Sequence, residues 1–243
     1  MQKDLVLARR KIMDGKIKEI LKELKSKGKK ENKEGMAKFG INTSTAFGVN
    51  VYVVRDLAKK YKKNHELALD LWKTNVHEAR MLSCFIDEPE KVSEKQMEKW
   101  VKDFNSWDLC DQTCSNLFDK THFAWKKAVE WCARKEEFVK RAGFVLMCAL
   151  AVHDKKAKDE KFEKFFPLIK KHSTDERNFV KKAVNWSLRQ IGKRNKKLNK
   201  KAIKIGKEIR KIESKSAKWI AGDALRELES EKVQKRLGRK ECS

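Results

Sequence analysis

The chain has 243 residues, of which 40% are hydrophobic and 39% are charged. Its seven Trp argue against a globally disordered protein, and with only two Pro and ten Gly it has too few turn-forming residues for a sandwich or barrel of many short strands. The formal net charge of +25 favours a polyanionic partner, and nucleic acid is the leading class.

Helix signals begin near the N-terminus. Apolar residues recur there at helical spacing (Ile17, Ile20, Leu21 and Leu24), and the polar stretch 25–35 that follows is expected to be a loop. Asn64 can cap a further helix, which is expected to end before Pro89. The apolar face of this helix is predicted to hold Leu67, Ala68, Leu71, Trp72 and Val76.

Two capping boxes mark later helix starts, since each has a Ser followed three residues later by a Gln or Glu. Ser93 and Gln96 precede the stripe Met97, Trp100, Val101 and Phe104. Ser173 and Glu176 are expected to open a helix over residues 178–194. Between them, residues 138–152 form one of the most apolar helical patterns of the chain and are predicted to be core.

Another apolar stripe surrounds Pro167, which must occupy the first turn of a new helix or break the old one. The members of this stripe are Phe162, Phe165, Phe166 and Ile169. Stripes within 198–212 and 216–228 predict two more amphipathic helices.

Helices joined by short loops, with no strand pattern between them, predict an all-α fold. Stacked antiparallel pairs in a HEAT-like helical-repeat solenoid fit best, and a compact bundle of the same helices is the alternative. No Ser/Gly/Pro-rich linker interrupts residues 40–230, so this part is expected to be one domain.

The cysteines and the hydropathy pattern indicate the cellular compartment that the chain suits. Six Cys occur in a chain with no apolar leader at its start, which favours reduced thiols and a cytoplasmic location over a disulfide scaffold. No window approaches the length of apolar sequence that a membrane-spanning helix needs. The high net charge favours a monomer.

Residues 193–215 hold eleven Lys or Arg and two Glu, a balance that suits binding to a phosphate backbone through counterion release. A solvated helix face is the alternative. Just upstream, Lys182, Trp186, Arg189 and Lys193 fall on one helix face. An indole among cations can be a packing contact, or it can stack on a base or sugar while the cations hold phosphates.

A second constellation pairs Trp107 with Asp111, four residues apart and therefore on one side of a helix. A lone Asp is commonly a partner for Arg or Lys. A carboxylate beside an aromatic wall also suits cleavage of a glycosidic bond, where negative charge stabilises an oxocarbenium-like sugar cation or orients water.

Metal and nucleotide chemistry are disfavoured. Cys110 and Cys114 are one helical turn apart, but no second pair or nearby His completes a four-ligand set. The five His form no HExxH pair, and neither a Walker A loop nor GxGxxG is present. No cofactor and no metal are expected.

Three stretches together resemble the DNA alkylation repair enzymes of the AlkD type: SWDLCD at 106–111, FVKRAGF at 138–144 and FVKKAVNWSLR at 179–189. The resemblance covers residues from about 36 to 228. It implies a HEAT-like solenoid whose concave, basic face holds double-stranded DNA, and a monofunctional glycosylase that removes cationic N3- and N7-alkylated purines. The chain then divides into a basic N-terminal helix and loop (1–35), a glycosylase domain (36–230) and a charged C-terminal tail (231–243).

The resemblance also implies site residues. Trp107 and Trp186 match two indoles that pack against the lesion-bearing deoxyribose, and Asp111 matches the catalytic carboxylate between them. Arg141 and Arg189 match DNA-contacting arginines. The expected DNA-binding set is Arg141, Lys182, Arg189, Lys193, Arg194 and Phe39, where Phe39 stands at a position that can hold a Tyr in the family.

Two other functions are also compatible with the sequence. A non-catalytic protein that binds DNA structures would need none of Trp107, Asp111 and Trp186. A helical scaffold for an acidic protein partner would gain nothing from alkylated over undamaged DNA.

Overall fold

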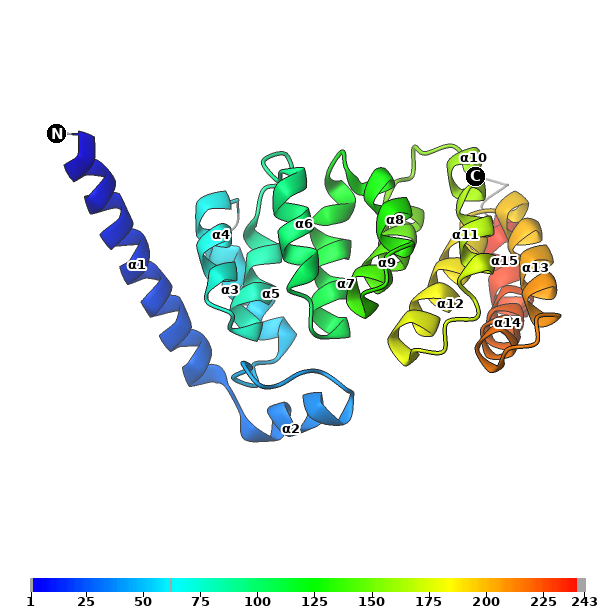
Figure 1. The fold of residues 1–243 in the computed structure, drawn as a ribbon, viewed down its shortest axis with the longest axis horizontal. Coiled ribbons are helices and arrows are strands. Elements are labelled where there is room, and N and C mark those ends of the chain that lie inside the picture. The colour runs from blue at the N-terminus through cyan, green and yellow to red at the C-terminus, as the bar shows by residue number, and fades with distance from the viewer. Residues whose placement is uncertain (1, 62, 240–243) are drawn as a thin grey trace. The chain divides into compact units, whose positions relative to one another are not determined.

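The computed structural model describes residues 2–61 and 63–239, and within these residues the chain forms helices and no strand (Figure 1). The chain divides into two compact units. Unit 1 comprises Met1–Glu98 and Asn105–Thr121, and unit 2 comprises Lys99–Phe104 and His122–Ser243. The division passes through α6 (Glu94–Lys102). Among the described helices, none is long and apolar enough to cross a membrane.

Unit 1 is built from helices in two layers. Its helices are α1 (Gln2–Lys27), α2 (Lys30–Lys38), α3 (Val51–Tyr61), α4 (His65–Lys73), α5 (His77–Ile86), α7 (Trp107–Asn116) and the short 3-10 helix η1 (Phe118–Lys120). α3, α5 and α7 pack in succession, while α4 packs on α5 and on α1. The predicted N-terminal stripe is confirmed, because Ile20 and Leu24 of α1 are buried.

The expected loop over residues 25–35 is wrong. α1 continues to Lys27 and α2 begins at Lys30, so two residues connect them. The helix breaks at Gly28, whose backbone packs against that of Phe47. A residue with a side chain does not fit there, because its Cβ would lie 2.3 Å from the carbonyl oxygen of Phe47. The N–H of Lys29 donates to the carbonyl of Gly48 at 3.1 Å, which fixes the connection.

The single helix expected after Asn64 is two helices. The cap itself is confirmed, since the Asn64 side chain accepts the N–H of Leu67 at 3.1 Å. α4 then ends at Lys73, because Asn75 adopts the left-handed region with φ 59°, which Asn tolerates better than most residues. α5 starts at His77 after this turn.

The two predicted capping boxes have different outcomes. Ser93 caps α6 by accepting the N–H of Gln96 at 3.1 Å, but the Gln96 side chain donates to Asp87 instead of reaching back. The second box is wrong, because Ser173 donates to the carbonyl of Lys170. Glu176 accepts the backbone N–H of Ser216 and so ties the start of one helix to the start of another.

Unit 2 continues the two-layer pattern. Its helices are α8 (Ala124–Cys132), α9 (Glu137–His153), α10 (Asp159–Glu163), α11 (Phe165–Lys171), α12 (Asn178–Gly192), α13 (Lys196–Arg210), α14 (Lys215–Leu228) and α15 (Glu231–Arg239). α9, α12 and α14 pack in succession as one layer, and α8, α11 and α13 form the other (Figure 1). Pro167 occupies the first turn of α11, which resolves the alternatives that the sequence left open.

Residues expected as a charged tail form α15. Its Val233 and Leu237 are buried, and the Gln234 side chain donates to Asn199 of α13 at 3.1 Å. The helix therefore belongs to the packed part of unit 2. Cys242 lies outside the described residues.

Candidate active site and nucleic-acid interface

α7 begins with the predicted aromatic wall and carboxylate. Trp107 is the first residue of the helix and Asp111 lies one turn later, so the two share a side of α7 as their spacing predicts. Both are half-buried. The preceding Ser106 is buried and donates its hydroxyl to Asp108 at 2.7 Å rather than to the helix end.

The Trp107 ring is held by a backbone atom. Its indole Nε1 donates to the carbonyl oxygen of Phe39 at 2.9 Å. Phe39 is the C-cap residue that follows α2, and its own side chain is 74% exposed. The structure therefore brings these two predicted residues together, and a contact of the Phe39 ring with DNA stays a prediction.

A buried ion pair lies directly beside Trp107, and sequence reasoning missed it. His77 Nε2 lies 2.9 Å from Asp108 Oδ2. Burial lowers the pKa of His77, but the hydrogen bond and charge of Asp108, together with Glu78, raise it to above its ordinary value of 6.5. Burial raises the pKa of Asp108, but hydrogen bonds from His77 and Ser106 bring it below 3.8. The sequence carries no signal for this pair, because its members are 31 residues apart.

A cavity of about 600 Å³ opens beside this pair. Its lining is mostly apolar and includes Met36, Ile41, Val49, Tyr52, Met81 and Trp107, while its charged or titratable members include Glu31, His77, Glu78 and Asp108. Glu78 is 1% exposed and accepts the N–H groups of Phe47, Gly48 and Val49 at 2.8–3.0 Å. This carboxylate therefore fixes the loop that forms one wall of the cavity.

In unit 2, α12 carries the predicted mixed aromatic and cationic face. Lys182 is exposed, while Trp186, Arg189 and Lys193 are half-buried. The first three lie within α12 and Lys193 caps its C-terminus. One helix thus presents all four residues, as the sequence predicts.

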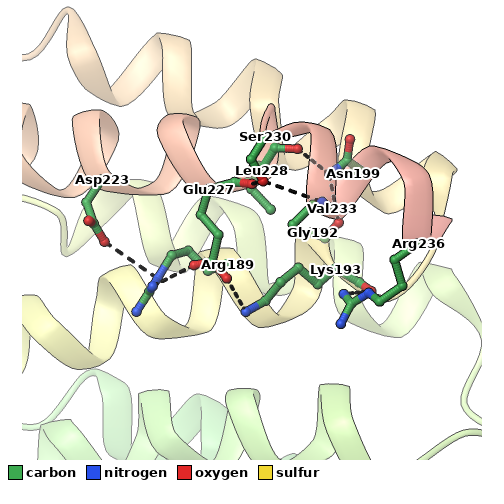
Figure 2. Close-up of polar contacts among 10 residues, drawn as sticks. All are labelled: Arg189, Gly192, Lys193, Asn199, Asp223, Glu227, Leu228, Ser230, Val233 and Arg236. Carbon is green, nitrogen blue, oxygen red and sulfur yellow. Dashed lines mark hydrogen bonds and ion pairs between the residues drawn. The ribbon is translucent and has the colours of Figure 1, made fainter.

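Two of these cations are already engaged by an acidic residue of α14 (Figure 2). Arg189 Nη1 and Lys193 Nζ each donate to a different oxygen of Glu227 at 2.6 Å. Asp223 lies 3.7 Å from Arg189 Nε. Burial raises the pKa of Glu227, but the hydrogen bonds from Lys193 and Arg189 lower it to below its ordinary value. Sequence reasoning missed Glu227 because nothing in the spacing links it to α12.

Arg141 and Arg194, two of the predicted DNA contacts, also have internal partners. Arg141 is 5% exposed and donates to the carbonyl of Phe179 at 2.6 Å, which joins α9 to α12. Arg194 donates to the carbonyls of Ala151 and Ala157 and lies 4.2 Å from the centre of the Phe162 ring. These contacts hold the repeat together, and binding of either guanidinium to DNA stays a prediction.

The comparisons with known proteins identify the family. A family model described as DNA alkylation repair enzyme matches residues 20–228. The chain belongs to this family. The match includes α7, α9, α12 and α14, which carry the residues described above.

A solved structure shows the fold. It is described as "a new family of proteins related to the HEAT-like repeat DNA glycosylases with affinity for branched DNA structures". Its sequence is 24% identical, the alignment covers 91% of this chain and 96% of that chain, and the TM-score is 0.75. The predicted HEAT-like arrangement of helix pairs is therefore confirmed. None of the curated proteins compared with the chain matches it.

The thiols of this family member are packing groups. Cys84, Cys110, Cys114, Cys132 and Cys148 are buried. Burial raises the pKa of Cys84 to about 12 and that of Cys132 to about 11, so both are protonated at neutral pH and poor nucleophiles. Among the described residues, no three His, Cys, Asp or Glu gather where they could hold a metal ion.

Proposed function

We propose that the chain is a DNA glycosylase that hydrolyses the N-glycosidic bond of cationic N3- and N7-alkylated purines in double-stranded DNA. The observation that carries the proposal is the pairing on α7 of an indole, held in place by the Phe39 carbonyl, with the carboxylate of Asp111. Membership of the DNA alkylation repair family supports it.

The chemistry follows from the charge of the substrate. An alkylated purine already carries a positive charge, so it leaves without protonation and takes the electron pair of the C1′–N bond. The sugar becomes oxocarbenium-like, and water then adds to C1′ and loses a proton. The faces of indole rings attract cations, and a nearby carboxylate stabilises the same charge.

In this proposal Trp107 stabilises the sugar cation, and Asp111 adds negative charge and orients water. Trp186 is proposed, on α12 by itself, as an indole that contacts DNA. Lys182 is exposed on α12 and is available to a phosphate. Arg189 and Lys193 each donate one hydrogen bond to Glu227 at 2.6 Å, so a phosphate that uses their remaining N–H groups competes with this carboxylate for their charge. Neither a metal nor a cofactor takes part.

The test is single-turnover release of 7-methylguanine from duplex DNA by the wild type and by Asp111→Asn. We expect the variant to lose about 100-fold or more in rate, in line with the removal of one preorganised electrostatic group. Its affinity for the same duplex should be equal or higher, because a charge that repels phosphate is gone. Asp70→Asn on α4, which removes an equal charge paired with Lys73, should keep the wild-type rate.

A non-catalytic DNA-structure binder is the second candidate, and the similar protein with affinity for branched DNA favours it. It predicts no release of 7-methylguanine by the wild type, with salt-dependent binding to DNA intact. Equal release by Asp111→Asn and the wild type would instead leave an enzyme whose carboxylate has been misassigned.

A further inference from the structure

α13 carries a row of lysines that the proposed active site does not use. Lys200, Lys204, Lys207 and Lys211 are exposed and recur at a spacing of four, three and four residues along α13 and its C-cap, so they share one side. The buried residues of α13, which include Leu198, Ala202 and Ile209, face the opposite way. At 1.5 Å per residue the row is about 17 Å long.

Most other cations near this row have acidic partners. Lys201 pairs with Glu163 at 2.5 Å, and Lys197 reaches both Glu160 and Glu163. By contrast, the ion pairs within residues 10–61 and 63–239 include none with Lys200, Lys204 or Lys211. Lys207 lies 3.7 Å from Glu229, so the uncompensated positive charge of the row is carried by Lys200, Lys204 and Lys211.

The lysines surround a shallow hollow of about 430 Å³. It is lined by Lys200, Ile203, Lys204, Lys207, Glu208 and Lys211. Its acidic member, Glu208, is engaged by Lys170 of α11 at 2.7 Å. An anion in this hollow would meet lysines on successive turns of the helix and no free carboxylate among these lining residues.

The row belongs to a different layer of unit 2 from the proposed active-site face. α11 packs on both α8 and α13 in one layer, whereas α12 packs on α14 in the other. We propose that the lysine row of α13 binds the phosphate backbone of a second DNA duplex segment, separate from the segment that α12 engages. This site does not require glycosylase activity, but it rests on the proposed binding of a first duplex segment by α12.

Duplex DNA fits the row better than an acidic protein does. A duplex presents about one charge per 1.7 Å of axis, so the row can meet several phosphates at once. Protein interfaces depend on buried aromatic or Arg anchors. The hollow offers none, since Ile203 is its one apolar lining residue.

The test is a capture assay with the full chain. The protein is bound to an immobilised undamaged duplex, unbound protein is washed away, and a fluorescent undamaged duplex is added. We expect the wild type to capture the second duplex and Lys200→Gln/Lys204→Gln/Lys211→Gln to capture little. The slope of log affinity against log salt for the second duplex should be about 2.7 smaller in the variant, at about 0.9 for each lost phosphate contact.

The matched control is Lys95→Gln/Lys99→Gln/Lys102→Gln, which removes three exposed lysines from one side of α6. It should capture the second duplex as the wild type does. The proposal is overturned if the wild type captures no second duplex, or if the α13 variant captures as much as the wild type. It is also overturned if the α6 control loses as much capture of the second duplex as the α13 variant does. Release of 7-methylguanine from a single duplex should be the same in all three proteins, so failure here is distinct from failure of the glycosylase.

Discussion

At the scale of single residues, Glu227 occupies the place that a phosphate would need. Its carboxylate accepts hydrogen bonds from both Arg189 and Lys193, the cations that the sequence predicts to bind DNA. A phosphate must either use their remaining N–H groups beside a like-charged carboxylate or displace it and break two charge-assisted hydrogen bonds. Part of the gain is lost in both cases. Glu227 therefore limits how strongly α12 holds any DNA.

Glu227→Gln should raise the affinity for undamaged duplex, because it frees two cations. If both then contact phosphate, the slope of log affinity against log salt should steepen by up to about 1.8. Binding titrations across a range of salt concentrations measure both quantities. Glu66→Gln on α4 removes the same charge from an exposed position and should change little. An unchanged slope in Glu227→Gln would show that Arg189 and Lys193 do not reach phosphate.

The His77–Asp108 pair gives unit 1 a pH dependence of its own. The contribution of His77 is complete below 6.5 and is lost as the pH rises through its raised folded pKa. That of Asp108 is complete above 3.8 and is lost as the pH falls through its lowered folded pKa. The pair therefore stabilises the fold most between these two values.

Asp108→Asn should lower the free energy of unfolding by about 3 kcal/mol in mild acid, where it leaves a buried His77 without its counter-charge. The loss should be smaller above the raised pKa of His77, because a neutral imidazole needs no counter-charge. Urea unfolding at about pH 5.5 and about pH 8.5 measures the difference. Asp56→Asn, an exposed carboxylate of α3, should show no such change between the two pH values.

At the scale of elements, a close backbone contact lies where α8 meets α9. A Cβ on Gly143 of α9 would lie 2.3 Å from the backbone nitrogen of Cys132 and 2.9 Å from the carbonyl carbon of Trp131. Backbone atoms cannot rotate away as a side chain can. Gly143 thus sets the spacing of this helix pair.

Gly143→Ala should destabilise the protein by about 2 kcal/mol or more, because the added methyl group forces the two helices apart. Gly222→Ala is the matched control, since a Cβ on this exposed residue of α14 would meet nothing within 4 Å. It should be neutral or stabilise by up to about 1 kcal/mol through helix propensity. Urea unfolding of both variants checks the pair, and a wild-type midpoint for Gly143→Ala would refute the packing argument.

The helices also differ in how far their bounds can be predicted from the sequence. The helices over 137–153, 196–210 and 215–228 follow from their apolar period, since packing and local preference agree there. The helix breaks at Gly28 and Asn75 do not follow from the apolar period. Each break depends on the backbone at one residue, and the spacing of apolar residues around it is unchanged. The Ser173 box failed because its Glu176 is recruited by a helix 40 residues away.

At the scale of the whole molecule, net charge predicts the class of partner better than it predicts the contact residues. The formal charge of +25 suits DNA. Yet the contacts of Arg141, Arg189, Lys193 and Arg194 are with the protein itself, and these pairings span 34 to 43 residues. By contrast, the spacing of Trp107 and Asp111 is local, so the sequence alone placed both on one side of α7.

The hydrogen bond between Trp107 and Phe39 bears on how the site can evolve. Because the acceptor is a main-chain carbonyl, every amino acid at position 39 supplies the same atom. A Phe and a Tyr there supply the same acceptor, so the hydrogen bond that orients the Trp107 ring places no restriction on the side chain at position 39.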